Sequence, residues 1–501
     1  MKYTPATLPL SQSFSTLGEA YFSRVNPTPF KTPVRLVHFN ESAAELLDLD
    51  PSLHLSAEGA RQIADVFSAQ KPLAGADPFA MLYAGHQFGH YVPQLGDGRA
   101  IVLGETINNR GENWEIQLKG SGITPYSRDG DGRAVLRSTI REYLCSEAMH
   151  ALGIPTTRAL CIIGSDDEVY RETIESGAMM TRLAPSHIRF GSFEVFYYRN
   201  QFDHIRTLAD FVLEHHFPHL NDDENCYANW LETVVERTAS LIAQWQTVGF
   251  CHGVMNSDNM SILGLTIDYG PFGFMEAYDP GYICNHSDHH GRYAYDRQPD
   301  IGLFNLTCFA QAILPLLSDE PEQAVDIAKD KLATYHQQYA KHYASGMRAK
   351  LGLTRSMAED QCLVDDLLAL MTEDRVDFTI LFRQLCAFST DNSNHNQAIR
   401  GLFIQRERYD QWAQRYRQRL SKETSADHQR LQRMRQTNPK YVLRNYLAEI
   451  AIRKAEDDQD YSEIDRLLNL LQHPFDENPE YESYAGFPPQ WANRITVSCS
   501  S

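Results

Sequence analysis

Residues 252–270 read His-Gly-Val-Met-Asn-Ser-Asp-Asn-Met-Ser-Ile-Leu-Gly-Leu-Thr-Ile-Asp-Tyr-Gly, and no other segment constrains the chain so strongly. The segment places the amide of Asn259 and the carboxylate of Asp268 nine positions apart, between a His-Gly pair and an Asp-Tyr-Gly turn. Oxygen-bearing side chains in this order are typical of the metal-binding part of a phosphoryl-transfer site. The segment therefore predicts a fold that brings nucleotide phosphates and a divalent metal ion together at this turn.

The same segment lacks one expected group. Kinase-like enzymes place a catalytic Asp after a His-Arg or His-Gly pair, a metal-binding Asn five residues later, and then an Asp-Phe-Gly type turn. Here Val254 stands where the catalytic Asp is expected, while Asn259 and Asp268 occupy the positions of the metal ligands. Valine can neither orient a hydroxyl group nor accept its proton. The segment is similar to a kinase metal site without the usual base, and its short Asn-to-Asp spacing argues against a standard protein kinase.

A matching phosphate-binding loop and lysine lie earlier in the chain. Residues 94–104 place Gly96 and Gly98 before an apolar stretch, which suits a loop whose backbone approaches phosphates, although many such glycine pairs are ordinary turns. Residues 114–119 then alternate like a half-buried strand and end on Lys119. The order and spacing make Lys119 the candidate phosphate-binding lysine, against the plainer reading of a solvated strand end.

A helix with an inward carboxylate follows. Residues 133–152 have helical periodicity and end at Gly153, and Glu142 lies beside the apolar stripe, where it can reach a lysine. A surface Glu paired with a nearby Arg is the alternative. Arg182 and Arg189 come next, and arginine binds phosphate well, although two arginines seven positions apart are common by chance.

Taken in order, these motifs resemble the selenoprotein O family, also called the YdiU family, of atypical kinase-fold protein adenylyltransferases. The resemblance runs from about Tyr83 to the C-terminal Ser-Cys-Ser-Ser. It is carried by Gln-Leu-Gly-Asp-Gly-Arg, Gln-Leu-Lys-Gly-Ser-Gly, His-Gly-Val-Met-Asn-Ser-Asp-Asn-Met-Ser, Ile-Asp-Tyr-Gly-Pro-Phe-Gly-Phe-Met and Tyr-Asp-Pro-Gly-Tyr-Ile-Cys-Asn-His-Ser-Asp. Members of this family are thought to bind ATP inverted relative to kinases, so that AMP is transferred to a protein hydroxyl.

The resemblance implies a role for each candidate residue. Asp258 would be the catalytic base, Asn259 and Asp268 would bind the metal ion, and Glu142 would position Lys119. The cations that would hold the inverted triphosphate are Lys119, Arg99, Arg182 and Arg189. The residues that would line the nucleotide are Gly96, Gly98, Asp131 and Gly132, with Asp268 also counted as a nucleotide contact. Without the resemblance, Asp258 could equally be a carboxylate that caps a loop.

The expected fold class is α+β, a protein-kinase-like two-lobed fold with a mainly helical C-terminal lobe and extension. We expect an N-terminal extension over 1–80 and an N-lobe with the nucleotide loop, the Lys strand and the Glu helix over 81–200. A helical C-lobe with the metal site would cover 201–420. A helical extension with a redox tail would cover 421–501, with a polar linker at 421–428 and an extended, proline-broken end after 472.

Composition agrees with a globular protein. The 501 residues carry a net charge of −19, which counts against broad nucleic-acid binding. No run of eighteen apolar residues and no signal-like start occur, so we expect no membrane partner and a cytoplasmic location. The oligomeric state is not legible in the sequence.

Two of the nine cysteines are distinctive. Cys284 lies shortly after the metal turn, and Cys499 lies in the tail at a place where some members of the family carry selenocysteine. The resemblance suggests a redox disulfide between Cys284 and Cys499. An idle tail cysteine is the plainer reading.

These inferences lead to one expected function and several alternatives. We expect transfer of AMP from ATP to Ser, Thr or Tyr hydroxyls of proteins, with Mg²⁺ or Mn²⁺. The alternatives are UMP transfer from UTP at the same site, a small-molecule or protein kinase, and an inactive nucleotide-binding pseudokinase that acts as a scaffold.

Overall fold

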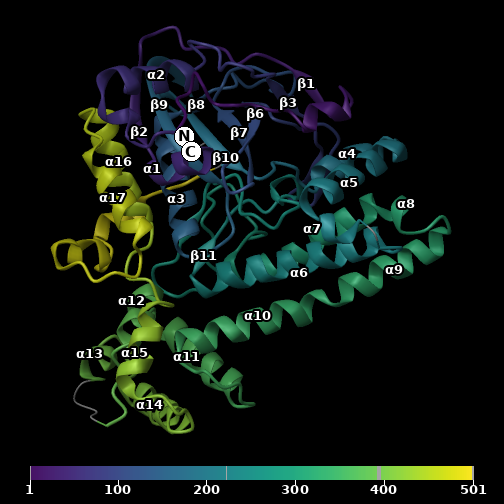
Figure 1. The fold of residues 1–501 in the computed structure, drawn as a ribbon. Coiled ribbons are helices and arrows are strands. Elements are labelled where there is room, and N and C mark those ends of the chain that lie inside the picture. The colour runs from purple at the N-terminus through teal and green to yellow at the C-terminus, as the bar shows by residue number, and fades with distance from the viewer. Residues whose placement is uncertain (1, 222, 392–395, 499–501) are drawn as a thin grey trace.

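An antiparallel sheet of eight strands forms the top of the molecule in Figure 1. The computed structural model describes residues 2–221, 223–391 and 396–498. Along the sheet the strands are β1 (Phe22–Arg24), β3 (Phe79–Met81), β6 (Ala100–Ile107), β7 (Asn113–Lys119), β10 (Ile174–Ala184), β9 (Arg158–Tyr170) and β2 (Val34–Phe39), and β8 (Ala134–Val135) pairs with β10. The chain is thus a mixed α/β protein, and its first eighty residues contribute strands to this sheet.

The register of the central strands places Lys119 beside the glycine-containing loop. Strands β6 and β7 form a hairpin in which Lys119 faces Ala100, the first residue of β6. On its other side Lys119 faces Met180 of β10. The backbone N–H of Gly120 then donates to Arg99 O at 2.7 Å, which ties the end of β7 to the end of the loop. The lysine is therefore held at the mouth of the 94–99 loop.

Helices cover both faces of the sheet. Successive side chains of a strand point to opposite faces, so each face has side chains that a helix can bury. On one face, the N-terminal helices α1 (Glu41–Ala44) and α2 (Ala57–Phe67) share a buried cluster with strand residues such as Ile101 and Leu118. On the other face, helix α3 (Leu136–Ala151) packs on β9 and β10. Helix α3 matches the helix predicted over 133–152, and Gly153, with φ +78°, ends it.

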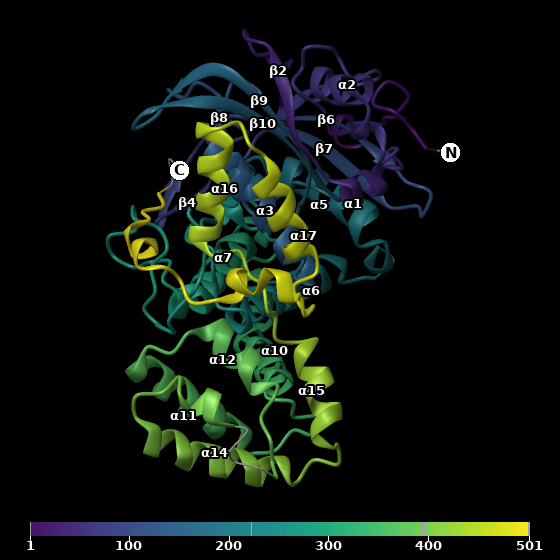
Figure 2. The same ribbon diagram turned by 90° about the vertical axis from the view of Figure 1, so that its left-hand side faces the viewer.

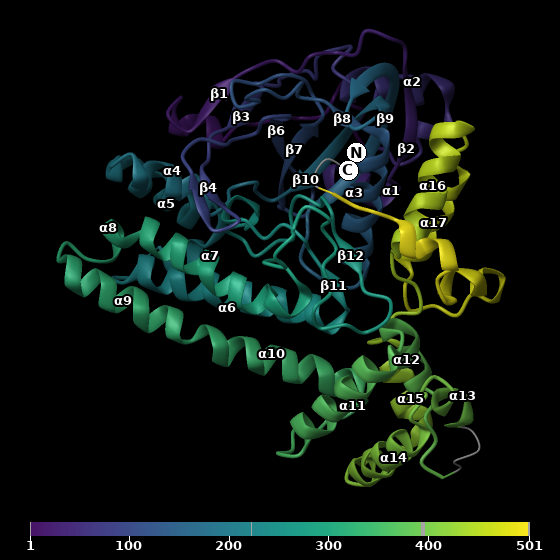
Figure 3. The same ribbon diagram turned by 180° about the vertical axis from the view of Figure 1, so that it is seen from behind.

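Helices fill the rest of the molecule, below the sheet in Figures 1 and 3. The first group is α4 (Gly191–Tyr198), α5 (Phe202–His216), α6 (Cys226–Thr247), α7 (Gln298–Ala312), α8 (Leu314–Leu317), α9 (Pro321–Ala333) and α10 (Tyr335–Lys350). The second group is α11 (Asp360–Asp374), α12 (Phe378–Leu385), α13 (Gln397–Arg400), α14 (Arg406–Leu420) and α15 (Asp427–Arg435). In the part of the chain that the structure describes, we find no helix with the length and apolarity needed to cross a bilayer.

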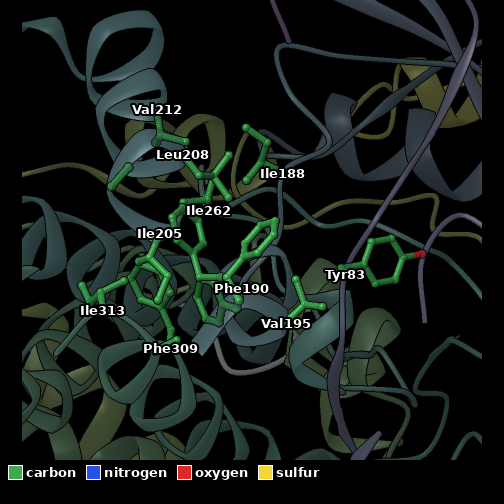
Figure 4. Close-up of a cluster of buried hydrophobic side chains, with 14 of the residues drawn as sticks. Tyr83, Ile188, Phe190, Val195, Ile205, Leu208, Val212, Ile262, Phe309 and Ile313 are labelled. Atoms are coloured by element: carbon green, nitrogen blue, oxygen red, sulfur yellow. The ribbon is translucent and has the colours of Figure 1, made fainter. Parts of the chain in front are cut away.

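A buried aromatic and aliphatic cluster joins α4, α5 and α7 just below the sheet. Figure 4 shows Phe190, Val195, Ile205 and Phe309 close together, with Tyr83 at one side of the group. The rings of Phe190 and Phe309 stack with centroids 4.9 Å apart. This cluster fixes the segment after Tyr83 against the first helices below the sheet.

Two short antiparallel pairs and irregular chain connect these layers. The hairpin of β4 (Gly85–Gln87) and β5 (His90–Val92) precedes the 94–99 loop. Strands β11 (Phe250–Cys251) and β12 (Gly273–Phe274) bracket the segment that carries Asp258, Asn259 and Asp268.

The C-terminal helices return to the sheet. Helices α16 (Asn445–Asp457) and α17 (Ser462–Gln472) pack on α3, as Figure 2 shows. The polar linker predicted at 421–428 falls between the end of α14 and the first residues of α15. The prediction of an extended end after residue 472 was incomplete: 3₁₀ turns form at Pro479–Ala485 and Gln490–Arg494. Pro479 starts the first of them because its fixed φ suits the first position of a helical turn.

Candidate nucleotide and metal site

A pocket of about 480 Å³ lies between the sheet and the segment between β11 and β12. Its lining combines the glycine loop, the end of β7 and the turn around Asp268. Among the residues predicted for the site, it contains Gly96, Gly98, Arg99, Lys119, Asp131, Gly132, Arg182, Asp258, Asn259 and Asp268. Glu142 and Arg189 do not line the pocket themselves. Each forms an ion pair with a lining residue, Glu142 with Lys119 and Arg189 with Asp268.

The glycine loop is held rigid by a buried carboxylate. Gly96 has φ +104°, and a Cβ there would come within 2.5 Å of the Tyr126 ring. The Asp97 carboxylate between the two glycines accepts hydrogen bonds from Met81 N and Gln117 Nε2, both at 3.2 Å. Burial raises the pKa of Asp97, and Arg189 opposes this effect. The loop therefore has a fixed shape, and Arg99 at its end is exposed toward the pocket.

A second tight turn holds Asp131 and Gly132 at the rim. Gly132 has φ +70°, and a Cβ there would lie 2.1 Å from the backbone of Gly122. Asp131 forms an ion pair with Arg171 at 2.7 Å and accepts a hydrogen bond from Arg133 N at 2.9 Å. Its carboxylate is thus already paired, so its contact with a ligand would be made beside Arg171.

Lys119 and Glu142 form an ion pair in the interior. The other oxygen of Glu142 accepts from Arg182 Nη1 at 3.1 Å, so one carboxylate holds two of the candidate phosphate-binding cations. Burial lowers the pKa of Lys119, and Glu142 opposes that effect. The structure thus places the inward carboxylate of α3 where the sequence predicted it.

Asp268 lies among three cations. Arg182 donates to its Oδ1 at 2.5 Å and Arg189 donates to its Oδ2 at 2.7 Å. The ammonium of Lys119 is 4.0 Å from Oδ1. Burial alone would raise the pKa of Asp268, but these three cations hold it well below its usual range. The ionised form of Asp268 is therefore strongly favoured.

Asp258 has the opposite environment, although it lies in the same pocket. It belongs to a short 3₁₀ turn, Ser257–Asn259, and its side chain is buried. Oδ2 accepts a hydrogen bond from Gln87 Nε2 at 3.1 Å, and Oδ1 is a buried atom without a hydrogen-bond partner in the described part of the chain. Burial raises the pKa of Asp258 to about 7, with Gln87 and Arg189 lowering it in part. The pKa values of these two neighbouring carboxylates are thus shifted in opposite directions.

Backbone contacts fix the segment that carries these groups. Asn259 Nδ2 donates to Val254 O at 3.1 Å, so its amide oxygen is the atom available to a metal ion. His252 contacts Ile267 O through Nε2 at 2.9 Å, which ties the start of the segment to the residue before Asp268. Val254 itself lines the pocket and offers only methyl groups.

Sequence reasoning missed several residues that shape the site. Gln87 contacts Asp258 from the β4–β5 hairpin, and Gln117 accepts two hydrogen bonds from Arg182. Gln117 stands two residues before Lys119 on the same strand, so its side chain points to the same face. That period-two spacing was the available signal for Gln117, whereas nothing local to residues 85–87 indicates a contact with residue 258.

The two candidate redox cysteines are only partly described. Cys284 is buried, and its thiol donates to Cys251 O at 3.4 Å. Burial raises the pKa of Cys284 well above its usual value. Cys499 lies outside the described residues, but Val497 O accepts a hydrogen bond from His286 N at 2.8 Å. The described part of the tail therefore reaches the loop that carries Cys284.

Comparison with known proteins identifies the family of this chain. A family model described as "Protein adenylyltransferase SelO" matches residues 5–472. A protein of Thiobacillus denitrificans named "Protein nucleotidyltransferase YdiU" is 55% identical over 499 residues, covering 99% of this chain and 100% of that protein. A Myxococcus xanthus protein of the same name is 54% identical over 494 residues, with 99% of both chains covered. The chain therefore belongs to the SelO family and is, by that membership, a nucleotidyltransferase.

Proposed function

We propose that this enzyme transfers AMP from ATP to Ser, Thr or Tyr hydroxyls of proteins, with the nucleotide bound inverted relative to protein kinases. The observation that carries the proposal is Asp258, a buried carboxylate with a pKa of about 7 and an unpartnered oxygen, beside Asn259 in the pocket. Val254 offers no base at the place where kinases have one. The basic group for this site is therefore Asp258.

The cations support binding of a triphosphate. Lys119, Arg99 and Arg182 line the pocket, and Arg189 contacts Asp268 from behind. Arg182 and Arg189 keep their charge because acidic neighbours raise their pKa against the effect of burial. Fixed positive charge would bind the triphosphate and stabilise a departing pyrophosphate without rearrangement during the reaction. Gly96, Gly98 and Gly132 allow close approach of the backbone, and Asp131 lies beside them.

The residues present also fit Mg²⁺ or Mn²⁺. Asn259 and Asp268 supply the amide and carboxylate oxygens that these ions prefer, and Asp268 is ionised. Bound to them, the metal ion would offset the negative charge of the nucleotide phosphates. When the nucleotide binds, Arg182 and Arg189 would exchange part of their contact with Asp268 for contacts with the phosphates, which are new anionic partners.

Asp258 would move the proton of the acceptor. Its carboxylate accepts the proton of the protein hydroxyl, and the hydroxyl oxygen then attacks the α-phosphorus of ATP. One P–O bond forms, the bond to the β-phosphate breaks, and pyrophosphate leaves with the electron pair. A pKa near 7 suits this role, because a base works best when its pKa is close to the working pH.

The fold that we propose for this reaction is the kinase-like two-lobed one. An N-lobe over 81–200 would supply the loop, Lys119 and Glu142, and a C-lobe over 201–420 would supply Asp258, Asn259 and Asp268. The pairing of Lys119 with Glu142 between strand and helix supports this arrangement. Residues 1–80 and 421–501 would be extensions of the two lobes.

One experiment separates the proposal from the alternatives. The protein is incubated with ATP labelled at either the α- or the γ-phosphate, and the label bound to protein is measured. We expect the α label on protein and the γ label in pyrophosphate. Transfer of the γ label would make the chain a kinase, and binding without any transfer would make it a scaffold. A parallel reaction with α-labelled UTP tests whether UMP is the transferred group.

A further inference from the structure

Three side chains with metal-binding groups meet beside strand β4 of the β4–β5 hairpin. They are His86 of β4, Glu194 of α4 and Cys308 of α7, and one ligand atom of each lies within 4.8 Å of the others. Among the described residues this is the only group of three or more His, Cys, Asp or Glu side chains that close. We call it the His86 cluster.

The cluster contains a polar atom that the protein leaves unpaired. Glu194 is fully buried, and its Oε2 contacts His86 Nδ1 at 2.5 Å. Its Oε1 is also buried and has no hydrogen-bond partner among the described residues. A buried carboxylate oxygen without a partner is costly, because it has lost its water and gained nothing in return. A simple His–Glu pair therefore does not satisfy this carboxylate.

The surroundings favour a metal ion that is bound through sulfur and nitrogen atoms. The His86 ring is flanked by Tyr91, Tyr198 and Phe304, with ring centroids 5.4, 6.0 and 5.8 Å away. Cys308 is buried, which raises the pKa of its thiol to about 12, while nearby Arg292 lowers it in part. A thiol, an imidazole and a carboxylate among aromatic rings form a donor set for a borderline transition-metal ion rather than for Mg²⁺.

We propose that His86, Glu194 and Cys308 bind one Zn²⁺ ion, separate from the metal ion of the nucleotide site. In a zinc site the metal lies about 2.0–2.3 Å from nitrogen, oxygen and sulfur ligands, so the ligand atoms draw closer than 4.8 Å. The Zn²⁺ ion takes the free oxygen of Glu194 and replaces the His86–Glu194 contact. The Zn–S bond forms as the thiol proton of Cys308 passes to solvent.

The proposed zinc site lies on the strand that covers Asp258, and this position gives the ion a structural role. The backbone N–H of His86 donates to Ser257 Oγ at 2.7 Å, and the next residue, Gln87, contacts Asp258. A Cβ on Gly85 would come within 2.5 Å of the Asp258 carboxylate, so strand β4 lies directly on the base. A Zn²⁺ ion that joins β4 to α4 and α7 holds this strand in place. The inference does not depend on which nucleotide group the enzyme transfers.

The test measures metal directly. The purified protein is incubated with Zn²⁺ in the presence of millimolar Mg²⁺, which occupies the oxygen-ligand site, and is then gel-filtered and its zinc content measured by mass spectrometry. We expect one zinc per chain in the wild type. In Cys308→Ala the zinc content per chain should be lower by roughly tenfold or more. Cys386→Ala, which removes another buried cysteine, and Asp268→Ala, which removes a ligand of the nucleotide site, should each retain one zinc.

A spectroscopic measurement distinguishes loss of a metal ligand from unfolding of a variant. Cobalt substitution should give a thiolate-to-cobalt charge-transfer band in the wild type. Cys308→His should retain one metal ion per chain without that band, and circular dichroism reports whether each variant is folded. Wild-type protein with far less than one zinc, or equal zinc in folded Cys308→Ala, would overturn the proposal and leave His86 and Glu194 as an ion pair alone.

Discussion

Gln87 Nε2 donates a hydrogen bond to Asp258 Oδ2 over 3.1 Å, and this contact joins the β4–β5 hairpin to the proposed base. The bond stabilises the ionised carboxylate, while burial favours the protonated one. The balance between these two effects sets the pH at which Asp258 can accept a proton, and it leads to the first two predictions.

The rate of AMP transfer should depend on the ionisation of Asp258. Because burial raises its pKa to about 7, kcat/KM of the wild type should rise as pH increases through about 7 and level off above it. Asp258→Ala should lose this rising limb of the pH profile and lower the rate by roughly 10²–10⁴-fold, with nucleotide binding retained. The measurement is the pH profile of incorporation of the α label. A wild-type rate in Asp258→Ala would show that the base lies elsewhere.

Gln87→Leu should move the same limb to higher pH. The substitution removes a hydrogen bond that lowers the pKa of Asp258, so more of the carboxylate is protonated at neutral pH. Activity should fall by several-fold at pH 7 and recover toward the wild-type value at higher pH, as one pKa unit is a tenfold change. Gln94→Leu is the control, since Gln94 is exposed at the start of the 94–99 loop and contacts Arg199 rather than Asp258. An unshifted profile with a uniformly low rate would mean that Gln87 acts only through the hairpin's shape.

Asp268→Ala should abolish transfer and also destabilise the protein without nucleotide. Arg182 and Arg189 are buried and both donate to this carboxylate, so its loss leaves like charges close together. Differential scanning fluorimetry should show a lower midpoint than in the wild type and no further rise from Mg²⁺ with ATP. Asp296→Ala, which removes an exposed carboxylate, should behave like the wild type. Full activity in Asp268→Ala would remove Asp268 from the metal site.

Oxidation should produce a reversible link between Cys284 and Cys499. His286 N contacts Val497 O, so the described part of the tail already lies beside the loop of Cys284. Since Cys284 is buried and its thiol has a raised pKa, the reaction should be slow until this loop opens. Peptide mass mapping should find the cross-link after oxidation, with lower activity that a dithiol restores, and Cys499→Ser should be insensitive. If the bond forms instead between Cys284 and Cys251, the tail has no role in the response.

The sequence predicted those parts of the site that depend on local order. Gly96 and Gly98 before a strand, Lys119 at a strand end and Glu142 beside the apolar stripe of a helix each have a short-range signal, and the structure brings these positions together. The helix predicted over 133–152 differs from α3 by a few residues at its N-terminal end, where residues 134–135 pair with β10 as β8. Tertiary pairing overrides helical propensity at such ends.

Contacts between distant segments could not be predicted in the same way. Strand β2 pairs with β9 from more than a hundred positions away, and its sequence does not specify that partner. The same holds for Gln87 and Asp258, which are 171 positions apart. The pKa of Asp258 was likewise not legible, because it results from burial, and burial depends on the hairpin that covers the residue.

The packing of α16 on α3 has a consequence for synthesis on the ribosome. Arg141, next to Glu142, contacts Asn445 at the start of α16 over 3.2 Å, and the two residues are 304 positions apart. Helix α3 also shares one buried cluster with α17 and with Tyr269, the neighbour of Asp268. A nascent chain that has emerged only as far as α15 would have all the proposed catalytic residues but not the helices that pack on α3, the helix of Glu142. The enzyme should therefore stay silent during translation and become competent only once residues 445–472 have left the exit tunnel.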